Sequence, residues 1–398
     1  MKLLLVDNAH LFKDVSGCYY TPSIYNDDFF QRYLSVFDSV RFVAKVRKVN
    51  EVDCQKMLKI TDSRVEILEL PWYSGTVDLL KKMPILVRLF RRSFQGCACA
   101  LLRLTQVEGI LAFLLGWDRK KPIAAEIVND PAELPGINKL VRVILVCTLK
   151  LILKHCVGVS YVTKGYLQRK YPFMIDVKSS NASRFTANYS SIELRSDEIL
   201  VPRSSIPFPI TLVHSSNHIS GTGKGHITAI HVVKELKNKG IETRLKFLGD
   251  GPDVATFAEL TKGLGIEKNV EFVGRLSNRK DYLAALDEGT VFIFPSFSEG
   301  LPRVIIEAQA RGLPCVASPV GGIVELVDKP NLVPPTDING YVERILKLCT
   351  NLDCYVEASR FGIEMAKNFE SKVMQSKRLV FYQQLLNAVE REYVDEEI

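Results

Sequence analysis

Short runs of apolar and β-branched residues alternate with longer segments of helical periodicity along most of the chain. In the second half the short runs are residues 210–214, 244–248, 270–273, 291–294 and 315–317, and helix-like segments begin near residues 224, 253, 279 and 302. In the first half the runs are residues 3–6, 40–46, 65–70, 123–128 and 159–162, with a long basic and apolar stretch between the third and the fourth. This alternation predicts an α/β chain of two Rossmann-like βαβ halves, because it is typical of parallel sheets with helices on both faces.

A proline-rich segment separates the two halves. Pro202, Pro207 and Pro209 lie within eight residues, where they remove backbone donors and stop regular structure. A chain of 398 residues is also longer than one hydrophobic core usually serves. We therefore expect a first domain over residues 1–199, a second over residues 200–372, and a final helix over residues 373–398.

Composition narrows the class of protein. Hydrophobic residues make up 47% and charged residues 24% of the chain, which excludes a long disordered or collagen-like protein. Nine cysteines lie scattered without a paired Cys-x-x-Cys spacing, so we expect reduced thiols and no metal site. The apolar run that opens the chain is too short for a signal peptide, and nowhere do about 18 apolar residues follow one another without a charge. These features predict a cytoplasmic chain that does not span a membrane.

The segment most informative about chemistry joins a strand, a short loop and a helix over residues 294–311. Pro302 suits a first helical position, and Gly312 and Pro314 end the helix. The helix N-terminus follows the carboxyl end of the preceding strand, where free amides and the helix dipole favour an anion such as a diphosphate. Glu299 in the loop and Glu307 in the helix flank this site. Carboxylates beside an anion site require a ligand that also carries hydroxyl groups, and a nucleotide sugar has both.

This segment resembles the retaining GT-B glycosyltransferases of the group 1 family, also known as family 4, whose mark is a Glu-x7-Glu motif. The motif here runs from Glu299 to Glu307, and residues 308–317, 321–325, 247–252 and 272–274 continue the family pattern. The resemblance implies the GT-B fold, in which two Rossmann-like domains face each other across a cleft. It also implies an enzyme of EC class 2.4, of the hexosyltransferase type, that moves a sugar with retention from a nucleotide sugar to a glycan or lipid-linked acceptor, in cell-surface polysaccharide synthesis.

The resemblance further implies roles for particular residues. Glu307 would bind the ribose hydroxyls, and Glu299 would contact the transferred sugar. Lys224, within Gly-Lys-Gly, matches the family lysine that neutralises the leaving diphosphate, a task that suits a compact ammonium on a flexible stem. Amides around the segment Gly300, Leu301, Pro302 and Arg303 would line the sugar and diphosphate. No metal or other cofactor is expected.

The first domain offers fewer candidates. Gly17 follows the first strand, where the family has a Gly-rich loop near the donor phosphates; a plain turn is the alternative. Asp130 stands at a strand end that resembles the family's cleft edge, where it would contact sugar or acceptor, although Asp before Pro is also an ordinary turn former. The family arginine upstream of the lysine is missing, since residues 214–218 hold only histidines as basic groups. Arg275 or Arg303 is expected to replace it, unless hydroxyl and amide donors suffice.

Positive charge is concentrated in two acid-free segments, residues 79–105 with six basic residues and residues 136–170 with seven. Because the whole chain carries a net charge of +7, the remainder is net negative. Lys139, Arg142, Lys150 and Lys154 fall near one helical face, with apolar residues on the other faces. This pattern favours an anionic membrane surface, so we expect peripheral binding to the inner face of the cytoplasmic membrane. No nucleic-acid reader motif is present.

Two alternatives to a transferase stay open at this point. A nucleotide-sugar epimerase would use the same two-domain architecture without an acceptor. A non-catalytic GT-B subunit would keep the fold, but loss of Lys224 or of either glutamate would be its signature, and all three are present.

Overall fold

The computed structural model describes residues 1–22, 24–50, 57–118, 120–133, 138–173 and 184–396. Within these residues the first half forms one sheet in the order β4-β2-β1-β6-β7-β8-β9, with β3 paired to β1 and β5 paired to β3. Its strands are β1 (Lys2–Lys13), β2 (Tyr19–Thr21), β3 (Ser39–Lys48), β4 (Leu58–Ile60), β5 (Val65–Pro71), β6 (Cys99–Arg103), β7 (Ile123–Ile127), β8 (Gly158–Tyr161) and β9 (Phe185–Asn188). All pairs are parallel except those that β2 makes with β1 and β4.

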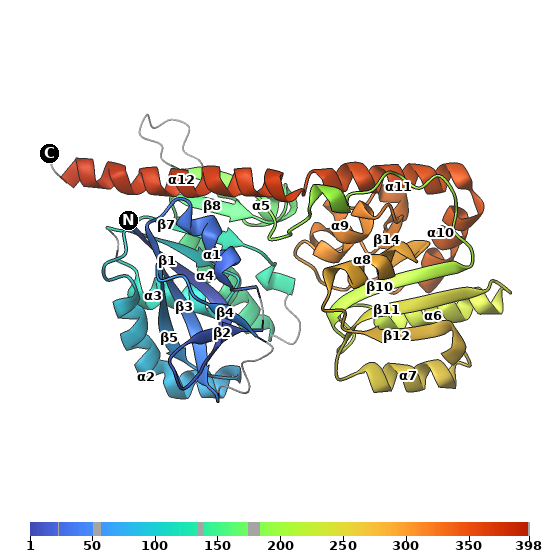
Figure 1. The fold of residues 1–398 in the computed structure, drawn as a ribbon, viewed down its shortest axis with the longest axis horizontal. Coiled ribbons are helices and arrows are strands. Elements are labelled where there is room, and N and C mark those ends of the chain that lie inside the picture. The colour runs from blue at the N-terminus through green and yellow to red at the C-terminus, as the bar shows by residue number, and fades with distance from the viewer. Residues whose placement is uncertain (23, 51–56, 119, 134–137, 174–183, 397–398) are drawn as a thin grey trace.

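Helices accompany this sheet in the βαβ manner (Figure 1). They are α1 (Asp27–Leu34), α2 (Gly75–Ser93), α3 (Val107–Gly116), α4 (Lys139–Leu153) and α5 (Tyr166–Lys170), with 3-10 turns η2 (Pro131–Glu133) and η3 (Ser196–Glu198). Side chains that alternate along the strands divide between two buried clusters, as Leu3 and Leu5 join one and Leu4 and Val6 join the other. Both faces of this sheet are therefore buried, as a parallel sheet requires.

The second half forms a parallel sheet in the order β12-β11-β10-β13-β14. Its strands are β10 (Ile210–His218), β11 (Thr243–Asp250), β12 (Val270–Gly274), β13 (Val291–Phe294) and β14 (Cys315–Ala317). Its helices are α6 (His226–Asn238), α7 (Val254–Gly263), α8 (Arg279–Asp287), α9 (Arg303–Ala310), α10 (Ile338–Thr350) and α11 (Leu352–Lys367), with 3-10 turns η4 (Glu267–Asn269), η5 (Gly321–Glu325) and η6 (Lys329–Asn331). Every strand expected in this half from the sequence is confirmed.

The chain crosses back to the first sheet through α12 (Ser371–Glu396), which lies along the first half of the molecule (Figure 1). The Phe381 ring meets that of Phe185 edge-on at 5.0 Å, and the Tyr382 ring lies 5.0 Å from that of Tyr33. Aromatic pairs of this kind add to the free energy gained by burying apolar surface. The last helix of the chain thus packs on the hydrophobic core of the first half.

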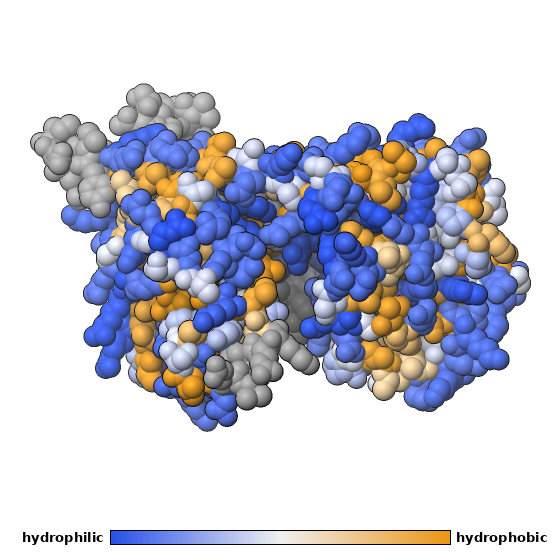
Figure 2. Space-filling view, in the orientation of Figure 1, coloured by the Kyte–Doolittle hydropathy of each residue, from blue (hydrophilic) through white to orange (hydrophobic). Residues whose placement is uncertain are grey.

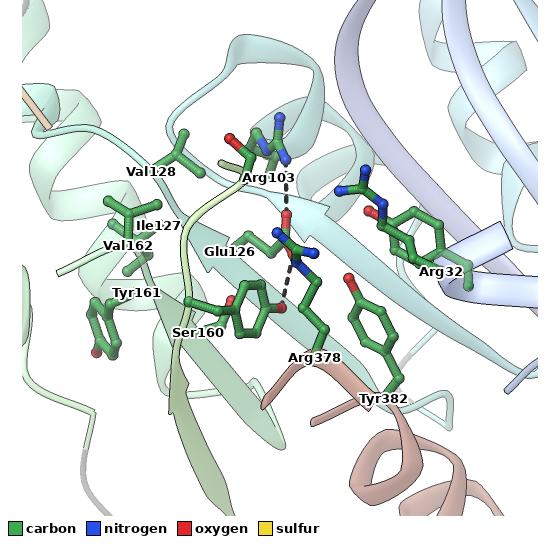
Figure 3. A pocket seen from close by; sticks show the side chains of 13 residues that line it. Arg32, Arg103, Glu126, Ile127, Val128, Ser160, Tyr161, Val162, Arg378 and Tyr382 are labelled. Atoms are coloured by element: carbon green, nitrogen blue, oxygen red, sulfur yellow. Dashed lines mark hydrogen bonds and ion pairs between the residues drawn. The ribbon is translucent and has the colours of Figure 1, made fainter. Parts of the chain in front are cut away.

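A buried polar network lies next to α12, where β6 and β7 end beside the middle of β1 (Figure 3). Arg103 makes ion pairs with Asp7 and, at 3.0 Å, with Glu126, whose other oxygen accepts the Tyr189 hydroxyl at 2.8 Å. Burial alone would lower the pKa of Arg103, but its charged partners raise it well above the ordinary value. Arg103 therefore cannot contribute to a basic surface, although it is one of the six basic residues of the acid-free segment 79–105.

The structure departs from the sequence-based expectations at three elements. Strand β6 lies at the centre of the first sheet, although no strand was expected there from the sequence. It belongs to the basic, apolar stretch that also contains α2 and α3. Strand β1 continues past its pairing with β6 to Lys13, where it pairs with β2 on one side while it remains paired with β3 on the other. Helix α9 begins at Arg303, and Pro302 is its N-cap with an extended backbone (φ −71°, ψ 112°) rather than its first helical residue.

Eight cysteines lie in the described residues and none of them forms a disulfide; Cys54 lies outside these residues. Four of the eight are buried, three are partly buried, and Cys147 is exposed. Over the same residues, no helix combines the length and apolarity that crossing a membrane would need.

Two of the contacts between the halves involve η5 and the loop before α9. The Glu325 carboxylate of η5 accepts hydrogen bonds from the backbone N–H groups of Lys164 at 2.6 Å and Gly165 at 2.9 Å. Gly300 approaches the end of β7 so closely that a Cβ there would lie 2.2 Å from the Val128 carbonyl oxygen. Only glycine fits this contact, which brings the loop of the Glu-x7-Glu motif against the first half.

Candidate active site

The loop between β13 and α9 is braced from within. The Ser296 hydroxyl donates to Glu299 Oε1 at 2.8 Å and lies 3.1 Å from the Gly223 carbonyl oxygen. The Phe297 N–H donates to the same Gly223 carbonyl at 2.9 Å. The Glu299 loop and the glycine-rich loop that begins α6 therefore form one unit.

Lys224 and Glu299 form an ion pair at the centre of this unit. Lys224 Nζ lies 2.6 Å from Glu299 Oε1, and the two side chains are 39% and 9% exposed. Gly225 follows with φ +72°, and a Cβ there would lie 2.0 Å from the Pro295 carbonyl oxygen. This glycine allows the two loops to touch, which places the ammonium beside the carboxylate. The structure thus brings together two site residues that the sequence separates widely.

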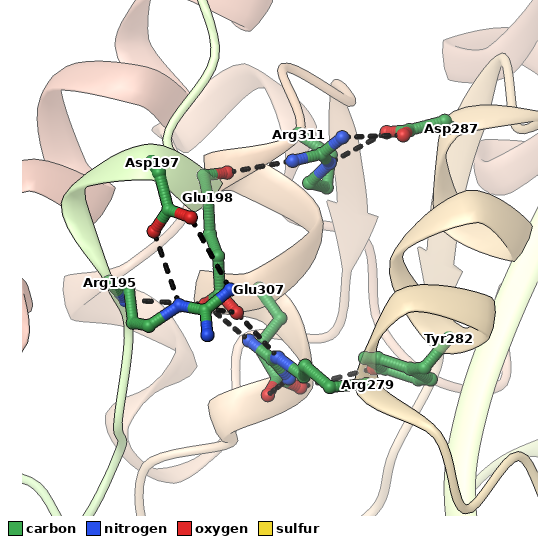
Figure 4. A network of polar contacts seen from close by, with 8 residues as sticks. All are labelled: Arg195, Asp197, Glu198, Arg279, Tyr282, Asp287, Glu307 and Arg311. Atoms are coloured by element: carbon green, nitrogen blue, oxygen red, sulfur yellow. Dashed lines mark hydrogen bonds and ion pairs between the residues drawn. The ribbon is translucent and has the colours of Figure 1, made fainter.

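Glu307 lies one helical turn inside α9 and faces a cavity of about 250 Å³. The cavity is lined by residues of α8, of α9, of the end of β10 and of the segment before α8, among them Asn217, Ser277, Arg279, Tyr282, Arg303 and Glu307. Arg279 Nη1 donates to Glu307 Oε1 at 2.6 Å, and the Tyr282 hydroxyl donates to Oε2 at 3.0 Å (Figure 4). Burial, and then the Glu307 charge, raises the pKa of Tyr282 well above its ordinary value, so this hydroxyl stays a donor.

The glycine-rich loop rests on two buried histidines. His214 Nε2 lies 2.9 Å from the Lys224 carbonyl oxygen, and the centre of its ring lies 4.5 Å from that of His226, with the two rings tilted by 45°. Burial, and then the neighbouring His226, lowers the pKa of His214 well below its ordinary value. Burial, and then the Lys224 charge, lowers the pKa of His226 to about 4. Both rings are neutral at pH 7 and cannot replace the missing cation of the family.

Of the two arginines considered as that replacement, Arg303 lines the cavity together with Asn217. Arg275 instead donates to the Asn217 carbonyl oxygen at 3.3 Å. The geometry therefore favours Arg303 at the first turn of α9, where the helix dipole also attracts an anion.

Asp130 is placed next to the cleft edge but its carboxylate is fully engaged. It accepts hydrogen bonds from the Ala132 N–H at 2.8 Å and from Tyr171, and it pairs with Lys170. Burial, and then the bond to Asp130, raises the pKa of Tyr171 above its ordinary value. The neighbouring Asn129 is better placed toward the site, since its Oδ1 would lie 2.7 Å from a Cβ on Gly300.

Gly17 lies in the turn between β1 and β2, with φ +87° and its N–H bonded to the Asp14 carbonyl oxygen at 3.1 Å. A Cβ added there would meet only the Lys13 side chain, at 3.9 Å. The structure thus gives Gly17 a turn geometry and no described contact with the Glu299 loop. Among the described residues, no cluster of three or more His, Cys, Asp or Glu side chains is suited to hold a metal ion.

Sequence analysis missed the partners of Glu307. Residue 279 was expected only as the start of a helix, and the sequence pattern did not single out Glu198, which holds Arg279. Neither residue belongs to a local sequence motif, because both reach Glu307 only through the tertiary contact between α8, α9 and η3.

The chain is similar to known proteins over part or most of its length. Residues 209–351 match the family described as "Glycosyl transferases group 1". Protein CapJ of Staphylococcus aureus is 28% identical over 351 residues, which cover 85% of this chain and 84% of CapJ. The structure of sucrose-phosphate synthase from Thermosynechococcus elongatus has a TM-score of 0.68 at 18% identity, covering 98% of this chain and all of that one. Anabaena HepE, solved in complex with UDP and glucose, has a TM-score of 0.65 at 14% identity and covers 98% of this chain and 99% of its own.

The GT-B fold, the family match and the similarity to CapJ together support a GT-B glycosyltransferase, an enzyme of EC class 2.4. Its residues 209–351 belong to the group 1 glycosyl transferases, as the Glu-x7-Glu motif predicted. This assignment favours the transferase over the epimerase that the architecture alone left open.

Proposed function

We propose that this enzyme transfers a sugar, with retention, from a nucleotide sugar to a glycan or lipid-linked acceptor in surface polysaccharide synthesis. The domain over residues 200–372 holds the donor, and the domain over residues 1–199 holds the acceptor. The observation that carries the proposal is the Lys224–Glu299 pair in the loop that leads into α9, the helix whose Arg303 and Glu307 line the cavity. The likeness to HepE, whose structure contains UDP and glucose, supports a nucleotide-bound donor.

The proposed mechanism uses each of these side chains at one part of the donor. Glu307 accepts hydrogen bonds from the ribose hydroxyls, and Glu299 from the sugar. Lys224 leaves Glu299 and stabilises the charge that builds on the diphosphate as the bond between the anomeric carbon and the phosphate oxygen breaks. The acceptor oxygen bonds to the anomeric carbon on the same face, and its proton passes to the departing phosphate oxygen. No step requires a metal ion.

The test begins with a choice of donor. Thermal stabilisation by UDP-, GDP-, ADP- and dTDP-sugars identifies the nucleotide, and calorimetry then gives its affinity. Glu307→Ala is expected to weaken binding about tenfold to hundredfold, because a hydrogen bond to a charged group contributes roughly 1.5–3 kcal/mol. Unchanged affinity in a folded Glu307→Ala protein would refute the ribose assignment. Product analysis with donor alone, and with glycan or lipid-linked acceptors, separates transfer from epimerisation.

We further propose that the enzyme binds the inner face of the cytoplasmic membrane through α2 and α4. Both helices expose apolar side chains next to basic ones. On α4, Leu140, Val143 and Ile144 are more than half exposed. On α2, Val77, Leu80 and Ile85 are also more than half exposed. Hydrophobic residues gather at the lower left of Figure 2, where Figure 1 places α2.

Apolar insertion together with attraction of roughly 1 kcal/mol per basic residue is how peripheral helices hold an anionic leaflet. Vesicle co-sedimentation tests this with and without anionic lipid, at 0.1 M and 1 M salt, since screening shortens the Debye length from about 10 Å to about 3 Å. Replacing the exposed Arg88, Arg91 and Arg92 by Gln should lower binding. The matched control replaces three exposed lysines of the second domain by Gln, namely Lys237, Lys239 and Lys268. Equal loss in both variants, or equal binding to neutral vesicles, would contradict the proposal.

A further inference from the structure

Both carboxylate oxygens of Glu307 are fixed by other side chains. Arg279 Nη1 donates to Oε1 at 2.6 Å and the Tyr282 hydroxyl donates to Oε2 at 3.0 Å. The Glu307 side chain is 15% exposed, so it still faces the cavity. Each carboxylate oxygen has two acceptor sites, and the two contacts therefore set the orientation of the group while leaving acceptor capacity on the cavity side.

Arg279 is itself held from behind. Its Nε and Nη2 donate to the two oxygens of Glu198 at 3.0 and 2.9 Å, a two-point contact that uses the planar fork of the guanidinium (Figure 4). Glu198 is 3% exposed. Burial alone would raise the pKa of Glu198, but the bonds from Arg279 hold it below the ordinary value, so the partner of Arg279 is a carboxylate.

Glu198 belongs to the segment through which the chain passes from one domain to the other. The Ser371 N–H at the start of α12 donates to the Leu194 carbonyl at 2.7 Å, and the Leu200 N–H donates to the Ala310 carbonyl at 2.8 Å. Arg311 Nη1 donates to the Glu198 backbone carbonyl at 3.0 Å. The chain passes between the domains twice, once after η3 and once at the start of α12, and these two segments lie together near η3. The Glu198 side chain extends from η3 to Arg279.

We propose that Arg279 is a positioning residue for nucleotide recognition, which orients Glu307 toward the ribose hydroxyls and is itself held in place by Glu198 of the interdomain segment. The inference rests on the proposed role of Glu307 as the ribose acceptor. Without Glu198, the Arg279 guanidinium is free to turn toward an anionic ligand in the same cavity, and Glu307 loses its orientation. The interdomain segment is in this way part of the ribose site.

The test compares ribonucleotides with their 2′-deoxy analogues. Calorimetry with UDP, GDP and ADP, each against its 2′-deoxy form, identifies the nucleotide that binds and gives its ribose preference. The wild type is expected to prefer the ribonucleotide by about tenfold or more, as loss of one hydrogen bond to a charged group implies. In Arg279→Gln the preference is expected to fall toward parity, and in Glu198→Gln to fall in the same direction. Arg279→Lys, which keeps the charge but cannot span both carboxylates, should lie between.

The control is Arg311→Gln, which removes an arginine from the same network without touching Glu307. Its ribose preference is expected to equal that of the wild type. If Arg279→Gln, or Arg279→Lys should the first variant not fold, weakens both nucleotides equally and keeps the preference, the positioning role is overturned. If the wild type itself shows no ribose preference, or binds none of the three nucleotides, the proposed role of Glu307 fails and the inference with it.

Discussion

Replacing Lys224 by methionine removes the ammonium that the mechanism assigns to the leaving diphosphate, while keeping an unbranched side chain of similar length. In the structure this ammonium lies 2.6 Å from Glu299 Oε1, and Ser296 Oγ lies 2.8 Å from the same oxygen. A bound diphosphate must therefore compete with Glu299 for the ammonium. The contribution of Lys224 to diphosphate affinity is therefore the free energy of its contact with the diphosphate minus that of its contact with Glu299.

The magnitude follows from that exchange. A hydrogen bond between charged groups contributes roughly 1.5–3 kcal/mol, but solvent screens an ammonium that is 39% exposed. We expect Lys224→Met to lower affinity for a nucleoside diphosphate by about 1 kcal/mol, roughly fivefold, and to leave the monophosphate unchanged. The loss in turnover is larger, about a hundredfold to a thousandfold, because charge on the leaving group is greatest in the transition state.

Glu299→Gln has the opposite effect on binding. It releases the ammonium and removes a negative charge beside the diphosphate, so diphosphate affinity should rise while transfer slows. Calorimetry with nucleoside di- and monophosphates gives the affinities, and initial rates with the donor found by thermal stabilisation give turnover. An unchanged ratio of diphosphate to monophosphate affinity in Lys224→Met would refute the reasoning, as would weaker diphosphate binding in Glu299→Gln.

Three further outcomes are expected. Gly300→Ala places a Cβ 2.2 Å from the Val128 carbonyl oxygen, so the substitution should push the domains apart. Most turnover should be lost, while the melting temperature of the second domain should stay the same. Full activity in this variant would contradict the contact. His226 has a pKa lowered to about 4, first by burial, so the unfolded chain takes up its proton below pH 6.5 and the folded chain does not. Stability is therefore lost as pH falls from 6.5 toward 4, by about 2 kcal/mol at pH 5, and urea unfolding of His226→Phe should lack this part of the slope. Transfer should persist in EDTA, and a strict requirement for Mn²⁺ or Mg²⁺ would contradict the metal-free mechanism.

Local sequence determined much of the second domain. Strands β13 and β14 have the bounds that their apolar runs predict, and α8 begins at Arg279 as expected. The interval between Glu299 and Glu307 identified the family because both residues lie on one strand–loop–helix segment. Backbone preference and hydrophobic periodicity act between near neighbours, so they can be recognised without knowledge of the rest of the chain.

The tertiary structure alone decided which distant groups meet. Strand β6 is buried between β1 and β7, although its surroundings in sequence are basic and helical. The sequence around Asp130 resembles the strand end that forms the cleft edge in the family, but in the structure Tyr171 and Lys170 bind the Asp130 carboxylate. The pairing of Lys224 with Glu299, and of Arg279 with Glu198 and Glu307, depends on how β10, β13 and the helices between them are ordered in the sheet. Such contacts join segments far apart in the chain, and their energies depend on burial and geometry that no local pattern contains.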